Sequence, residues 1–136
     1  MKFELSDKEF RLLLDMVYIG NWILNSARGF DRIPQYDELE SKIFAQCAKD
    51  PRLHSLFCIR GGEILPSPAF ENGGIQEAIV DYEDTVFFEI LAEELARRDM
   101  DFAPINAENF PELAVRMEEY IAEFEENGIE NISVDK

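Results

Sequence analysis

Histidine and cysteine, which supply most nucleophiles and transition-metal ligands in proteins, are nearly absent from this sequence. His54 is the only histidine, and Cys47 and Cys58 are the only cysteines. One disulfide could form, but both cysteines stand in apolar stretches, KIFAQCA and LFCI, which are typical of buried free thiols in a reducing cytosol. A zinc site needs about four ligands at paired spacings, which the chain does not offer. We therefore expect no cofactor and find no catalytic signature.

Long apolar runs and glycine-rich phosphate loops are missing as well. The most apolar stretch is 6–28, but Arg11 and Asp15 interrupt it before the roughly 20 residues that a membrane span needs. The start of the chain shows no signal-peptide pattern. The sequences RGG at 60–62 and NGG at 72–74 lack the glycine spacing and the lysine of a phosphate loop. These absences predict a soluble cytoplasmic protein.

Positive charge is scarce in the second half of the chain. Residues 1–68 carry 10 acidic and 9 basic side chains, whereas residues 69–136 carry 19 acidic and only 4 basic ones, within a net charge of −16. Nucleic acids and anionic membranes are bound through clustered lysine and arginine, so neither is an expected partner. A basic partner protein, a cation or plain solubility remain as explanations of the acidic half.

The stretch 6–28 carries the clearest helix signals. Ser6 and Glu9 form a capping-box pattern, and Leu5 and Phe10 are spaced for a hydrophobic staple, so we expect the helix to begin at Asp7. Its remaining residues are apolar around most of the circumference, which is typical of a helix buried in a bundle. The sequence therefore predicts that this helix is the buried centre of the fold.

Helical periodicity recurs three more times along the chain. It predicts helices at 35–49, at 75–100 as one kinked helix or two, and at 109–127. Residues 52–65 fit either a helical turn or a hairpin around Gly61–Gly62, and two short terminal stretches, Met1–Leu5 and Ile129–Val134, could pair as strands. We predict one mostly α domain, 1–136. It is an orthogonal or up-down bundle of four to five helices, with at most a small two-stranded element from the termini or from residues 56–65.

The second half of the last helix is crowded with acids, which oppose the helix dipole near its C-terminal end. One interpretation is a solvated face. The other is a docking surface for a basic protein, where binding removes the electrostatic penalty. The candidate interaction residues are Glu118, Glu119, Glu123, Glu125 and Glu126.

A narrow polar face on the first helix is the second candidate. Arg11, Asp15, Tyr18 and Trp22 follow one another at three- and four-residue spacings. Amphipathic aromatics of this kind commonly bridge a core and water. They could also line a pocket or a dimer face, so the sequence leaves monomer and homodimer open.

A magnesium site is the alternative to a binding role. Asp81 with Asp84, and Glu123 with Glu126, are three residues apart and so share a helix face, as in helical hydrolases of phosphorylated small molecules. In so acidic a chain such spacings also arise by chance. We therefore expect a non-enzymatic interaction or regulatory module whose acidic C-terminal half meets a basic partner. The alternative is a carboxylate–magnesium hydrolase, which would need at least three converging carboxylates.

Overall fold

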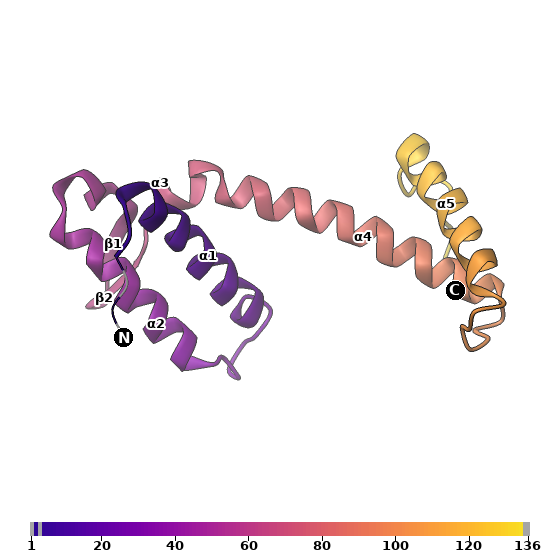
Figure 1. Ribbon diagram of the computed structural model, residues 1–136, viewed down its shortest axis with the longest axis horizontal. Helices are drawn as coiled ribbons and strands as arrows, with labels where there is room; N and C mark the ends of the chain where they lie inside the picture. Colours follow the sequence, from indigo (N-terminus) through magenta and orange to yellow (C-terminus); the bar gives the residue numbers. More distant parts are fainter. Residues whose placement is uncertain (1, 3, 135–136) are drawn as a thin grey trace. The chain divides into compact units, whose positions relative to one another are not determined.

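The computed structural model describes residues 2 and 4–134 and confirms a mostly α fold with a small β element (Figure 1). The helices are α1 (Asp7–Asn25), α2 (Pro34–Phe44), α3 (Pro68–Phe70), α4 (Gln76–Asp99) and α5 (Phe110–Asn127), and the strands are β1 (Phe57–Arg60) and β2 (Glu63–Pro66). Two 3₁₀ segments, η1 (Ala45–Lys49) and η2 (Pro51–Leu56), and a π segment, η3 (Glu71–Ile75), complete the described elements.

The chain divides into two compact units, Met1–Ile79 and Val80–Lys136. The boundary falls within α4, and each unit is described by itself below. The prediction of one folding domain over 1–136 stays a prediction.

The first helix begins as its sequence predicts. The backbone N–H of Ser6 donates to Glu9 Oε2 at 2.8 Å, and the Ser6 hydroxyl accepts from the Glu9 N–H at 3.4 Å. The helix ends at Asn25, three residues before the end of the stretch 6–28 that carries the helix signals. The Asn25 side chain holds the following loop, because its Oδ1 accepts from the Ile33 N–H at 2.8 Å and its amide donates to Ile33 O at 3.1 Å.

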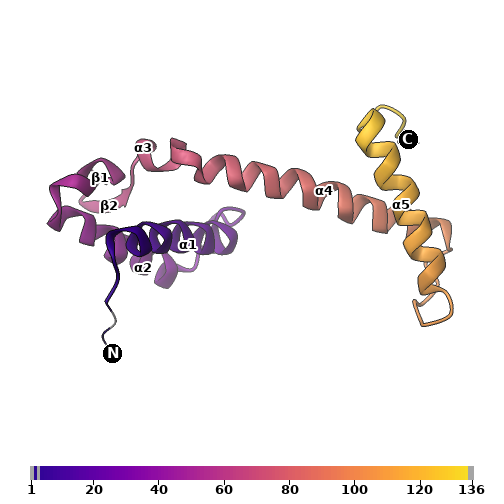
Figure 2. The same cartoon turned by 45° about the horizontal axis from the view of Figure 1, so that its top comes forward.

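In the first unit α1 lies against α2, and the hairpin packs against α2 (Figure 2). The core joins these elements through edge-to-face aromatic contacts, Tyr18 with Phe70 at 5.4 Å and Phe44 with Phe70 at 5.0 Å between ring centroids. Leu14 and Cys47 are buried beside them, and both cysteines are free thiols, as expected.

The ambiguous stretch 52–65 contains both predicted alternatives, a helical segment (η2) followed by the hairpin β1–β2. Gly61 and Gly62 have φ values of +61° and +87°, which a two-residue hairpin turn of the primed type requires. Residues 129–134 form turns and coil rather than a strand. The other strand of the predicted terminal pair includes Met1 and Phe3, which lie outside the described residues.

The prediction that the first helix is the buried centre of the fold is wrong for one of its apolar faces. Leu12, Met16 and Ile23 are 61%, 72% and 58% exposed, whereas Leu14 on the opposite side is fully buried. The first unit packs its other elements against a single side of α1, so apolar periodicity alone overestimated the burial of this helix.

α4 crosses the boundary between the two units as one continuous helix at 76–99, so the predicted alternative of two separate helices does not occur there. After α4, Asp101 and Phe102 both have φ above +50°, which reverses the chain ahead of α5. Gly128, at φ +57°, ends α5 as predicted. The rings of Phe88 of α4 and Phe124 of α5 contact each other in a tilted arrangement with their centroids 5.5 Å apart, and this contact brings the two helices together.

Candidate functional site: an acidic-walled groove between α4 and α5

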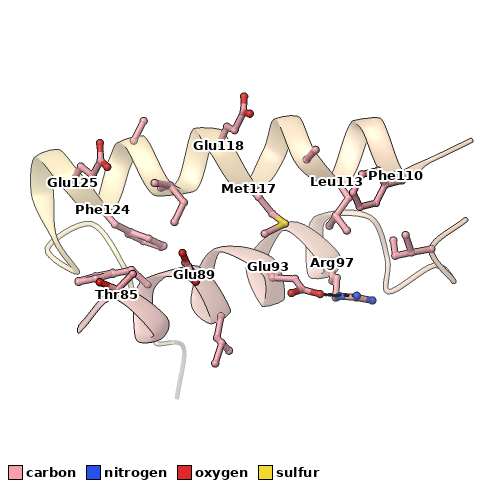
Figure 3. A pocket seen from close by; sticks show the side chains of 16 residues that line it. Thr85, Glu89, Glu93, Arg97, Phe110, Leu113, Met117, Glu118, Phe124 and Glu125 are labelled. Atoms are coloured by element: carbon pink, nitrogen blue, oxygen red, sulfur yellow. Dashed lines mark hydrogen bonds and ion pairs between the residues drawn. The ribbon is translucent and has the colours of Figure 1, made fainter. Parts of the chain in front are cut away.

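A groove with a volume of about 1100 Å³ lies between α4 and α5 in the second unit. Figure 3 shows Leu113, Met117 and Phe124 pointing from α5 toward α4. We call this hollow the α4–α5 groove. Its apolar lining consists of Phe88, Ile90, Ile105, Phe110, Leu113, Ala114, Met117, Ile121, Ala122 and Phe124. A groove of this size with an apolar floor suits the apolar face of a helix or a comparable ligand.

Carboxylates border the apolar surface on both helices. Glu89 and Glu93 line the groove from α4, and Glu118 and Glu125 line it from α5. Arg97 is the one basic residue in the lining, and its Nη2 lies 2.6 Å from Glu93 Oε1. The two residues are four apart on α4, a spacing that places both side chains on one face of a helix. Three of the four carboxylates in the lining thus have no ion-pair partner among the residues that line the groove.

The predicted interaction residues are divided among different environments. Glu118 and Glu125 belong to the groove, whereas Glu119 borders a smaller hollow lined by other α5 residues, and Glu126 is exposed outside both. Glu123 is half-buried and accepts hydrogen bonds from Asn127 at 3.0 Å and Asn131 at 2.6 Å. The acidic half is therefore not one uniform face, and only two of the five residues lie beside apolar surface that a ligand could cover.

A polar clamp joins α5 to the C-terminal end of α4. The Tyr120 hydroxyl donates to Asp99 Oδ2 at 2.5 Å, and Arg98 Nη2 lies 2.8 Å from Asp99 Oδ1. These bonds lower the pKa of Asp99, and the adjacent carboxylate raises the pKa of Tyr120. Glu94 and Arg98 have the four-residue spacing of a helical ion pair, but the structure pairs Arg98 with Asp99 instead. The clamp fixes the relative position of the two helices that form the groove.

The second candidate set, on α1, is tied into the core of the first unit. The Tyr18 hydroxyl donates to Glu71 Oε1 at 2.9 Å and accepts from Gln76 Nε2 at 2.5 Å, and burial with the nearby Glu71 raises the pKa of Tyr18 to about 12. Trp22 packs against the core, and the Arg11 guanidinium lies over the Phe70 ring at 5.1 Å. These three side chains thus lie at the edge of the core, between its interior and water. Asp15 beside them is half-buried. A pocket or dimer role for the four residues stays a prediction.

Sequence reasoning missed a partly buried polar cluster between α1 and α2. Asn21 and Asn25 of α1 both donate to Asp37 Oδ1, at 3.0 and 3.4 Å, and Arg32 Nη2 lies 2.6 Å from the same oxygen. Glu40, one turn further along α2, is only 8% exposed, and this burial raises its pKa to about 7. Two asparagines one turn apart inside an apolar helix were the available signal for this cluster.

The carboxylates of the magnesium alternative do not converge. Over the part of the chain that the structure describes, no three side chains of histidine, cysteine, aspartate or glutamate are grouped closely enough to hold a metal. Asp81, Asp84, Glu123 and Glu126 accordingly form no such group, and the geometric condition for that function is not met there.

Comparisons with known proteins add no relative to this description. No family model, no curated protein and no solved structure matches the chain. None of the helices in the described part of the chain combines the length and the apolar character needed to cross a membrane. Any functional assignment therefore depends on the site itself.

Proposed function

We propose that this protein is a non-enzymatic interaction module whose α4–α5 groove binds a basic, amphipathic helical segment of a partner protein. The observation that carries the proposal is the combination of an apolar floor with carboxylates on both walls. A helix laid in the groove would place its apolar face on Phe88, Met117 and Phe124. Lysines or arginines flanking that face would meet Glu89 on one wall and Glu118 on the other.

The charge of the second unit supports a basic rather than an acidic occupant. Residues 80–136 contain 17 acidic and 4 basic side chains, which would repel an acidic segment and accelerate encounter with a basic one. A second copy of the same unit is disfavoured on this ground, because it brings the same negative charge. Within a typical helix–groove complex, the apolar contacts give most of the affinity, and the flanking charges give orientation and rate.

The test uses a fluorescently labelled helical peptide with leucines on one face and lysines on both flanks, and anisotropy reports binding. We expect binding at about 0.05 M salt that weakens at about 0.5 M, since exposed charges are screened. The double variant Glu118→Lys, Glu125→Lys should bind at least about tenfold more weakly. A peptide in which serines replace the leucines should not bind, because no apolar side chains of the peptide would then be buried on the apolar floor of the groove.

A matched variant separates the groove from overall charge. Glu119→Lys with Glu126→Lys changes the net charge by the same amount, but neither residue lines the groove. This control should bind within about twofold of the original protein. Equal losses in the two double variants would contradict the proposal and leave only nonspecific attraction to an acidic surface.

A further inference from the structure

The two ends of the α4–α5 groove are lined by different kinds of side chain. Figure 3 shows Thr85 and Glu125 at one end of the groove and Arg97 and Phe110 at the other. α4 therefore runs from the first end to the second, and α5 runs back in the opposite direction. A helical ligand that lies along the groove can take either of these two directions.

Acidic and basic residues are divided unequally between the two ends. We call the part of the groove formed by 80–91 of α4 and 118–127 of α5 the carboxylate half, and the part formed by 92–99 and 110–117 the arginine half. The carboxylate half contains nine acidic side chains and no basic one, whereas the arginine half contains four acidic and three basic ones. A positively charged group of a ligand is therefore attracted more strongly to the carboxylate half.

Ion pairing increases this difference. In the described part of the chain, the ion pairs of the second unit all belong to the arginine half, and they are Arg97–Glu93, Arg98–Asp99 and Arg116–Glu112. In the lining, Glu93 is thus neutralised by Arg97. Glu89 and Glu125 of the carboxylate half line the groove without a cationic partner among the lining residues. The carboxylates that remain for a ligand are therefore concentrated toward one end.

The helix dipoles act in the same sense. α5 ends in the carboxylate half, where its last carbonyl groups carry partial negative charge. In the arginine half, the N-terminal end of α5 and the C-terminal end of α4 carry opposite partial charges, which offset each other. A ligand helix carries partial positive charge at its N-terminus, so this terminus is stabilised in the carboxylate half.

We propose that the partner helix lies in the α4–α5 groove with its N-terminus in the carboxylate half, parallel to α4, and that its lysines or arginines are concentrated in its N-terminal half. This inference rests on the function proposed above and specifies the direction and the charge pattern of the ligand. Thr85 and Arg97 are twelve residues apart, about 18 Å of helix, so the groove holds roughly three turns. Basic side chains in the first turns of the ligand meet Glu89 and Glu125.

The direction of binding can be measured with the peptide described above, whose lysines flank the leucine face on both sides. A nitroxide is attached to its N-terminus or to its C-terminus. In a Cys58→Ser background, a fluorophore is attached at Glu126→Cys in the carboxylate half, or at Ala107→Cys in the turn before α5, next to the arginine half. Both positions are exposed and lie outside the groove lining. We expect the N-terminal nitroxide to quench the label at 126 at least about threefold more strongly than the C-terminal nitroxide does, and the reverse at 107.

Two peptides of identical composition test the charge pattern. One carries its lysines in the N-terminal half and the other in the C-terminal half, with the same leucine face. We expect the first to bind about tenfold more tightly to the original protein. Lysines near the N-terminus oppose the dipole of the free peptide, so the first peptide is the weaker helix former, and a difference in helicity alone would give the opposite order. Equal affinities would contradict the proposed charge pattern.

A triple variant should remove the preferred direction. Glu89→Gln and Glu125→Gln eliminate the unpaired carboxylates at one end of the lining, and Arg97→Gln leaves Glu93 unpaired at the other. We expect the difference in quenching between the two nitroxides to fall below about twofold, or to change sign. Circular dichroism verifies that the variant remains folded.

The matched control makes the same charge changes outside the groove lining. Glu83→Gln and Glu119→Gln remove two carboxylates of the carboxylate half, and Arg116→Gln removes an arginine of the arginine half. This control should keep the direction of the original protein. Equal quenching at both ends in the original protein, or the opposite direction, would overturn the inference while leaving the groove as the binding site. A peptide that does not bind at all would overturn both.

Discussion

Replacing Phe70 by alanine is expected to destabilise the first unit by about 4 kcal/mol. The Phe70 side chain is 1% exposed and contacts the rings of Tyr18 and Phe44 edge-to-face. Its face also carries the Arg11 guanidinium. Truncation leaves a cavity among elements that are far apart in the sequence, and each lost aromatic pair adds about 1 kcal/mol to the loss of burial.

Urea denaturation followed by tryptophan fluorescence is the appropriate measurement, because the single tryptophan, Trp22, packs against this core. Phe30→Ala is the matched control, since Phe30 is fully exposed, and its loss should change stability by less than about 0.5 kcal/mol. A destabilisation below about 1.5 kcal/mol for Phe70→Ala would show that this residue does not join the elements of the core.

Replacing Glu40 by glutamine is expected to stabilise the protein at pH 8 by about 2 to 3 kcal/mol. Burial raises the pKa of Glu40 from 4.5 to about 7, and Asn21 only partly offsets this effect while Asp37 and Glu71 add to it. Above pH 7 the native protein must therefore hold a buried charge that the unfolded chain exposes to water. Glutamine keeps the volume and removes that cost.

The pH dependence has a definite sign. The native state binds the Glu40 proton more tightly than the unfolded state, so the wild-type residue contributes stability below about pH 4.5 and loses it as the pH rises to about 7. The stability difference between Glu40→Gln and the original protein should thus be large at pH 8 and small at pH 4. Glu38→Gln, which changes an exposed residue of the same helix, should show no such trend. A Glu40→Gln protein that is less stable at pH 8 would contradict the prediction.

Local chemistry made several elements of this fold predictable. The start of α1 follows from Ser6 and Glu9, whose reciprocal bonds need only a four-residue segment. The stop of α5 follows from Gly128, whose positive φ suits a residue without Cβ. Both signals depend only on residues that are close together in the sequence, so they can be recognised without knowledge of the tertiary fold.

The groove could not be predicted, because it depends on which face of α4 meets α5. Apolar residues occur all round α4, including exposed Phe87 and Ile90, so their spacing does not select one side. The acidic residues of α5 were recognised from composition, but Glu89 on α4 was not. Only packing shows that Glu89 and Glu118 border the same apolar floor. The unexpected exposure of one face of α1 has a similar cause. The sequence shows that this face is apolar, but not whether another element packs against it.

The contact between α4 and α5 also has a consequence for the size of any ligand. Ala92 and Ala96 are fully buried, and they lie on the same face of α4 as Phe88 and Asp99, which both contact α5. Two methyl groups therefore act as the spacers between the helices. Replacing Ala96 by the larger valine or leucine would increase the distance between α4 and α5. A substitution at the buried Ala96 would therefore change the width of the groove, although Ala96 is not among the residues that line it.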